Sequence, residues 1–144
     1  MIEKDTVRLL RECDAGIKMG VDSINEVMDR VEDEKFRELL NECKDRHEKL
    51  ADELRLLLER YEDDGKDPNF MAKSMSFMKT EMKMAMNDSD KTIADLMTEG
   101  CNMGIKSLSK YLNEYKAADE KSKDITKRLI TLEENLVRDI RQYL

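Results

Sequence analysis

Apolar side chains recur every three or four residues in four stretches of the chain, which is the spacing of amphipathic helices packed in a bundle. In the first stretch the stripe is interrupted only by Asp14, and in the second only His47 is strongly polar. We therefore expect helices over residues 4–31, 33–62, 89–115 and 119–143. The first two stripes are Val7, Leu10, Asp14, Ile17, Val21, Ile24, Met28 and Val31, then Phe36, Leu40, Cys43, His47, Leu50, Leu54, Leu57 and Tyr61.

The connections between these stretches predict the topology. Only Glu32 and Asp33 separate the first two helices, so these should form an antiparallel hairpin, and the last two should do the same. Residues 63–68 contain Gly65, which suits a helix end, and Pro68, which suits a helix start. A shorter helix over 69–86 could cover about 27 Å at about 1.5 Å per residue, and so return along the bundle.

The predicted fold class is therefore all-α: a four-helix bundle of two antiparallel hairpins, with a helical crossover between the second and third helices. The third helix should run parallel to the second, a one-crossover topology. The 144 residues have room for one domain with one core.

Charge and cysteine usage exclude several classes. The net charge is −7, and residues 1–68 carry 13 Lys or Arg against 21 Asp or Glu, which argues against a nucleic-acid binder. No apolar run approaches the roughly 18 residues of a membrane span, and the first residues lack the hydrophobic stretch of a signal peptide. Three Cys without a Cys-x-x-Cys spacing predict reduced thiols. We expect a cytoplasmic protein.

The predicted order of elements, a hairpin, a crossover and a second hairpin, resembles the ferritin-like superfamily. Four segments carry this resemblance: VRLLRECDAGI (7–17), HEKLADEL (47–54), EGCNMGIKSL (99–108) and RDIRQYL (138–144). They are most similar to a family of short bacterial ferritin-like four-helix-bundle proteins of unknown function. The resemblance implies a ferritin-like bundle. In the superfamily's di-iron members, one Glu comes from each of two helices and a Glu-x-x-His motif from each of the other two.

The di-iron motif is degenerate in this chain. Lys44 stands three residues before His47 where the motif needs Glu, and neither Glu133 nor Glu134 is followed by His at the third position. Asp14 takes the acidic position of the first helix. On the third helix the inward position is Cys101, with Glu99 as the nearest acid. The resemblance therefore implies the fold more strongly than the iron chemistry.

Counting residues from the two hairpin turns places four metal-compatible side chains near the middle of the bundle. These are Asp14, His47, Cys101 and Glu133, with Cys43 and Glu99 as outer candidates. They form a tentative site for a single Zn or Fe ion. The reading that we favour is a structural one, in which Asp14 and His47 form a hydrogen-bonded core pair, Glu133 lies in solvent, and the three Cys are buried as small hydrophobes.

Glycine and methionine suggest further contacts. Gly16 and Gly20 in the first helix, and Gly100 and Gly104 in the third, predict a close approach of these two helices; a dimer contact or room for a ligand are alternatives. One stripe of the crossover is Met-rich, with Lys73, Lys79 and Lys83 beside it. This stripe consists of Met71, Met75, Met78 and Met82. It either packs on the bundle or forms a partner-binding face.

The sequence carries no motif for a nucleophile, a phosphate loop or a calcium loop. We therefore expect a non-catalytic ferritin-like bundle with a structural or protein-interaction role, as a homodimer, without a cofactor. One alternative is a metal-binding protein with a single asymmetric Zn or Fe site. A second is a ferritin-like oxidase or iron-storage protein.

Overall fold

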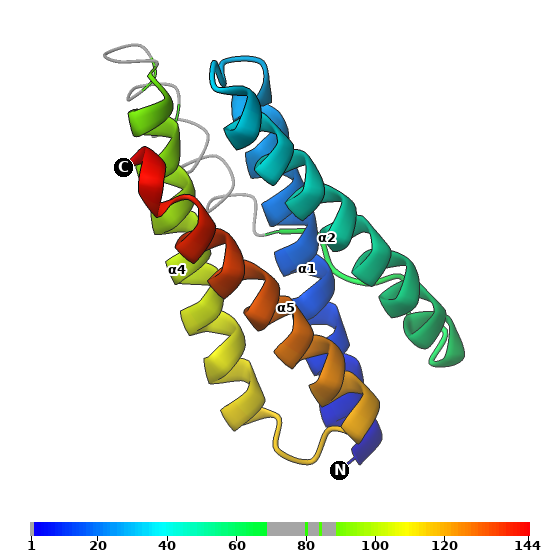
Figure 1. The fold of residues 1–144 in the computed structure, drawn as a ribbon. Helices are drawn as coiled ribbons and strands as arrows, with labels where there is room; N and C mark the ends of the chain where they lie inside the picture. The colour runs from blue at the N-terminus through cyan, green and yellow to red at the C-terminus, as the bar shows by residue number, and fades with distance from the viewer. Residues whose placement is uncertain (1, 69–79, 81–83, 85–88) are drawn as a thin grey trace.

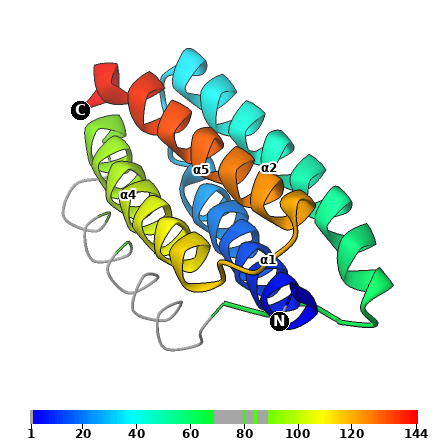
Figure 2. The same cartoon turned by 90° about the horizontal axis from the view of Figure 1, so that it is seen from below.

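The computed structural model describes residues 2–68, 80, 84 and 89–144, and in these residues the chain forms four long helices and no strand (Figure 1). The helices are α1 (Ile2–Met28), α2 (Glu34–Arg60), α4 (Asp90–Glu114) and α5 (Glu120–Asp139), followed by the short 3-10 helix η1 (Arg141–Tyr143). The four predicted helices are thus present, with ends that differ by one to four residues. Figure 2 shows the same four helices from below, side by side along their length.

Side-chain caps explain where three of the helices begin. The side chains of Asp33, Ser89 and Asp119 accept hydrogen bonds from Phe36, Thr92 and Ser122, three residues ahead in each case. Such caps satisfy backbone N–H groups that have no partner within the helix.

Helices α2 and α4 run in the same direction, as the sequence predicted (Figure 1). Their first turns meet, because the Asp90 carboxylate accepts hydrogen bonds from the backbone N–H groups of Glu32 and Asp33, at 2.8 and 2.9 Å. At the opposite end, the backbone N–H of Asp119 donates to Thr6. The chain therefore leaves α2 at one end of the bundle and enters α4 at the other.

The core is one apolar cluster to which all four helices contribute side chains. Leu10, Phe36, Leu54, Ile93 and Leu129 are fully buried in it. The ring of Tyr143 from η1 stacks on Phe36 with 4.4 Å between ring centroids, and closes the end at which the chain terminates. Burial of this apolar surface is the main stabilising term of the bundle.

The predicted stripe of α1 is correct at Leu10, Ile17, Ile24 and Val31, which are buried, but between these positions the core face lies one residue earlier than predicted. Positions 7, 14, 21 and 28 are only half-buried, and the core-facing residues include Thr6, Cys13 and Val27 instead. One residue corresponds to about 100° around a helix. This rotation turns Asp14 away from the core and puts Cys13 there.

The crossover expected over 69–86 lies outside the described residues, apart from Thr80 and Met84. Both of these are buried, and Met84 belongs to the core cluster. The expected stripe of Met71, Met75, Met78 and Met82 also lies outside the described part, so its role stays a prediction.

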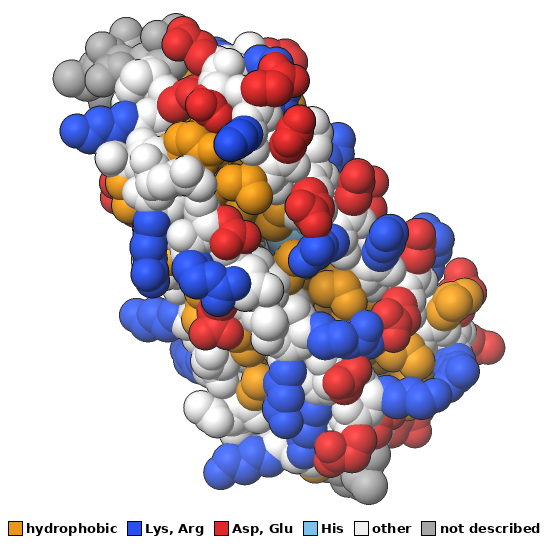
Figure 3. All heavy atoms as spheres, viewed as in Figure 1, with side chains coloured by type: hydrophobic (Ala, Val, Ile, Leu, Met, Phe, Trp, Pro, Cys, Tyr) orange, Lys and Arg blue, Asp and Glu red, His pale blue; other side chains and the backbone are white. Residues whose placement is uncertain are grey.

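The surface over α5 and α2 mixes both signs of charge, with apolar side chains showing only in small strips between them (Figure 3). Among the residues described, no helix is both long and apolar enough to cross a membrane.

Candidate functional site

His47 lies in the middle of the bundle, as predicted, and is 2% exposed. Its Nδ1 donates a hydrogen bond to the backbone carbonyl of Cys43 at 2.8 Å, which leaves Nε2 as the unprotonated nitrogen of a neutral ring. Nε2 has no hydrogen-bond partner among the residues that the structure describes, and it lies against Gly20 of α1. Burial lowers the pKa of His47, so the ring stays neutral at neutral pH.

Glu133 of α5 is also buried, which corrects the expectation that it lies in solvent. Its Oε2 has no hydrogen-bond partner and lies against Gly104 of α4. Burial raises its pKa to about 8, because the charged form of the carboxyl is removed from water. The side chain is therefore mainly an uncharged acid at neutral pH.

The two hairpins repeat one arrangement. In each, the second helix sends a buried polar side chain toward a glycine of the first: His47 toward Gly20, and Glu133 toward Gly104. A Cβ on Gly20 would lie 3.0 Å from His47 Nε2, and a Cβ on Gly104 only 2.4 Å from Glu133 Oε2. Both glycines therefore make room for a polar side chain.

This arrangement corrects the expected role of the glycines as points of close helix approach. A Cβ on Gly16 would make only ordinary contact with Leu108 and Leu129, and one on Gly100 would meet nothing within 4 Å. Only one glycine of each predicted pair is thus required by its surroundings. The sequence signal was present, since glycine costs about 1 kcal/mol in a helix interior, but it did not reveal which side chain fills the space.

The three cysteines are free and buried, as predicted. Burial raises the pKa of Cys13 and Cys43 to about 12, and also raises that of Cys101. Cys43 Sγ lies 3.5 Å from His47 Nδ1, and Cys13 Sγ lies 3.1 Å from the Thr126 hydroxyl. Thiols that hold their proton so firmly are poor nucleophiles and poor metal ligands.

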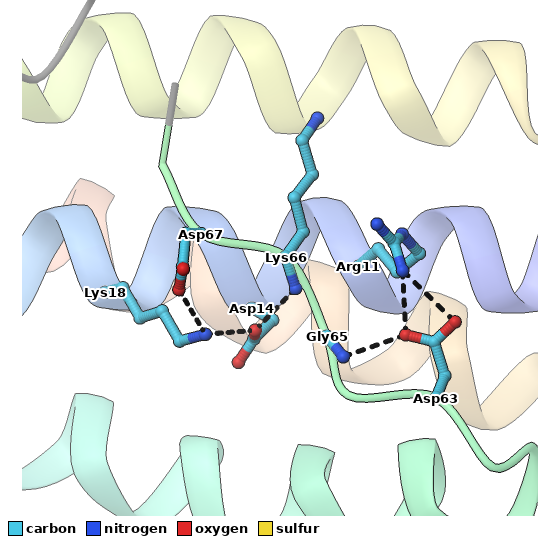
Figure 4. Close-up of polar contacts among 7 residues, drawn as sticks. All are labelled: Arg11, Asp14, Lys18, Asp63, Gly65, Lys66 and Asp67. Atoms are coloured by element: carbon cyan, nitrogen blue, oxygen red, sulfur yellow. Dashed lines mark hydrogen bonds and ion pairs between the residues drawn. The ribbon is translucent and has the colours of Figure 1, made fainter. Parts of the chain in front are cut away.

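Asp14 does not reach His47, so the predicted Asp14–His47 core pair is wrong. The Asp14 carboxylate instead accepts a hydrogen bond from the backbone N–H of Lys66 at 2.9 Å and pairs with Lys18 at 2.8 Å (Figure 4). Because the stripe of α1 is rotated, Asp14 faces the segment that follows α2. No local sequence pattern indicates this contact, which joins residues 52 positions apart.

The tentative metal ligands are therefore only partly brought together. His47, Glu133, Cys43 and Cys101 are all buried, Asp14 lies on another face of α1, and Glu99 is half-buried on α4. In the part of the chain that the structure describes, no three His, Cys, Asp or Glu side chains are grouped so that they could hold a metal ion.

The chain matches the family described as a domain of unknown function, DUF2383, over residues 5–114, which is more than half of its length. The chain belongs to this family. Comparisons with curated proteins and with solved structures gave no match.

The DUF2383 match spans α1, α2 and α4 and ends before α5 begins. It therefore includes His47, Gly20 and Gly104, whereas Glu133 lies outside it. The part of the mid-bundle site that the DUF2383 match covers is the histidine with its facing glycine, while the buried acid comes from the remainder of the chain.

Proposed function

We propose that this chain is a non-catalytic four-helix bundle of the ferritin-like type, with a structural or protein-interaction role in the cytoplasm of a bacterium. Its parallel α2 and α4 helices support the ferritin-like relationship, because one crossover connection is a hallmark of those bundles. A homodimer is part of the proposal. Dimers with two-fold symmetry are the commonest soluble homo-oligomers.

The proposal rests mainly on the two glycines that face the mid-bundle polar residues. A di-iron centre needs inward acids from all four helices. Among the described residues, the side chains that face Gly20 of α1 and Gly104 of α4 are the imidazole of His47 and the carboxyl of Glu133, so neither glycine position supplies an acid. Asp14 is held by Lys66 and Lys18 instead. The residues present do not fit a di-iron centre.

The test is a metal inventory of the purified protein combined with its mass in solution. The protein is incubated with Fe²⁺ and oxygen, or with Zn²⁺, desalted, and analysed for metal per chain. We expect much less than one metal per chain, no acceleration of Fe²⁺ oxidation over buffer, and twice the chain mass by light scattering. Two irons per chain with rapid Fe²⁺ oxidation would replace this proposal by an oxidase or iron-storage role.

A single-metal site is the second candidate, and one observation favours it. The hydrogen bond from His47 Nδ1 to the Cys43 carbonyl fixes the tautomer that leaves Nε2 available, which is how many metal-binding histidines are held. Glu133 or Cys101 would have to move toward it. One Zn²⁺ per chain, with a rise in melting temperature that His47→Gln abolishes, would establish this function.

A further inference from the structure

The chain that follows α2 does not leave the bundle at once but lies along α1. We call residues 63–67 the strap. The guanidinium of Arg11 in α1 donates hydrogen bonds to both carboxylate oxygens of Asp63, at 3.0 and 3.2 Å. The same carboxylate accepts a hydrogen bond from the backbone N–H of Gly65 (Figure 4). The strap thus begins with a turn that is anchored on α1.

The strap continues along α1 through three further polar contacts. The backbone N–H of Lys66 donates to Asp14, the Lys66 ammonium pairs with Glu12 at 2.5 Å, and Asp67 pairs with Lys18 at 3.1 Å. Gly65 adopts φ +86°, and a Cβ on it would lie 2.3 Å from Asp14 Oδ2. Glycine is therefore required here both for the backbone angle and for the close approach.

Ion pairs and hydrogen bonds hold the strap on α1. None of residues 61–68 is fully buried, so little apolar surface is removed from water when it docks. The cations of its ion pairs are about two-fifths exposed, whereas the exposure of the carboxylates ranges from 15% at Asp14 to 89% at Asp67. Exposed pairs contribute little each and are screened by salt. The apolar core beneath α1 is not affected by salt in this way.

We propose that the strap is a releasable clamp, which undocks from α1 as a unit while the four-helix bundle stays folded. Ionic strength controls the release, and Asp14 is its central anchor because it joins the strap backbone to Lys18. Segments with few buried apolar contacts open at a lower free energy than the core.

Release of the strap changes one surface of the molecule. Asp67 and Pro68 form part of the wall of a hollow of about 630 Å³ between α1 and α2, whose other lining includes Ile17, Val21 and Ala51. The hollow is also lined by Lys18, Asp22 and Glu48. When the strap leaves, Asp67 no longer contributes to this wall, and the side chains of α1 that line the hollow become more accessible. The clamp therefore couples the ionic conditions to the exposure of this mixed surface of α1.

Amide hydrogen exchange, measured by NMR on the full chain, tests the proposal. The reporters are the N–H groups of Gly65 and Lys66, and the references are the core amides of Leu54 and Leu129. Between about 0.05 and 1 M NaCl, where the screening length falls from about 13 to 3 Å, exchange of the reporters should accelerate several-fold. The core amides should not change.

Asp14→Ala should accelerate Lys66 exchange about tenfold at low salt, since a charge-assisted hydrogen bond and an ion pair are lost. Gly65→Ala should do the same by a different route, because its new Cβ cannot coexist with Asp14. The matched control is Asp52→Ala, which removes an exposed carboxylate paired with Arg55 within α2. It should leave the reporters unchanged.

Reporters that exchange as slowly as the core amides at every salt concentration would overturn the proposal, since the strap would then open only by global unfolding. Equal effects of Asp14→Ala and Asp52→Ala would also overturn it. If Asp14→Ala unfolds the chain, the core amides reveal this, and the salt series on the unmodified protein still decides.

Discussion

At the scale of single residues, two glycines without side chains make room for two buried polar side chains at the centre of the bundle. His47 and Glu133 occupy the space of missing side chains, and each has one buried atom without a hydrogen-bond partner. Such atoms cost free energy, on the order of 1–3 kcal/mol each. The bundle carries this cost inside its core.

A matched pair of substitutions on α4 tests the role of Gly104. Gly100→Ala should stabilise the protein by up to about 1 kcal/mol, because alanine favours the helix and the new Cβ meets nothing. Gly104→Ala gains the same helix propensity but forces Glu133 out of its place, and should destabilise by about 1–3 kcal/mol. Urea unfolding at pH 6 measures both.

The control for this pair is Gly104→Ala combined with Glu133→Ala, which removes the side chain that the new Cβ would displace. Most of the lost stability should return. If Gly104→Ala alone proves as stabilising as Gly100→Ala, then Glu133 does not depend on the glycine.

The sequence could predict His47 as inward but not Asp14 as outward, and the reason lies in one stripe. The predicted stripe of α1 was correct at positions 10, 17, 24 and 31 but not at 7, 14, 21 and 28, since the true core face also includes Thr6 and Cys13. The buried Thr6 hydroxyl accepts a hydrogen bond from the backbone N–H of Asp119, which is 113 residues away along the chain. No local pattern reveals this contact. Glu133 was misplaced in solvent for a related reason, since nothing local shows that a glycine on another helix makes room for it.

At the scale of elements, caps and spacing predicted the four helices well, because both are local. The strap was not predictable in the same way. Residues 63–68 read as a helix stop and a new start, yet their contacts with Arg11, Asp14 and Lys18 depend on how α2 returns alongside α1. Local signals mark where a segment ends, whereas tertiary contacts decide where it lies.

The contact between the two hairpins at the beginning of α4 gives a prediction at this scale. Asp90 accepts the backbone N–H groups of Glu32 and Asp33, so it joins the α1–α2 turn to α4. Asp90→Ala should lower the free energy of unfolding by about 1–2 kcal/mol, since two N–H groups lose a charged acceptor. Thermal and urea unfolding measure the loss. Lys91→Ala, one residue further along and exposed, is the control and should change stability by less than about 0.5 kcal/mol.

At the scale of the whole molecule, two buried groups make stability depend on pH in opposite directions. The pKa of Glu133 rises from 4.5 to about 8 on folding, so its contribution is complete below pH 4.5 and is lost as pH rises through 8. The pKa of His47 falls below 6.5, so its contribution is complete above pH 6.5 and is lost as pH falls through the lowered pKa.

Between pH 4.5 and 6.5 the two effects oppose one another. Each amounts to about 1.4 kcal/mol per pH unit where one state holds one proton more than the other. Within this window their slopes largely cancel until the folded-state pKa of His47 is reached, and stability should be nearly flat just below pH 6.5. Above pH 6.5 only the Glu133 effect remains.

Stability should therefore fall between pH 6.5 and 8 by about 2 kcal/mol, since the slope of about 1.4 kcal/mol per unit acts over that interval. Urea unfolding at half-unit steps from pH 5 to 8.5 under reducing conditions measures the profile. The upper limit avoids the cysteines, because the raised pKa of Cys13 and Cys43 causes a further loss of stability above their ordinary value of 9. Glu133→Gln keeps the shape of the side chain without its proton, and should remove the fall between pH 6.5 and 8 while leaving the acid limb that His47 controls. A variant profile that still falls there would mean that another group carries the dependence, and that Glu133 is ionised within the folded bundle.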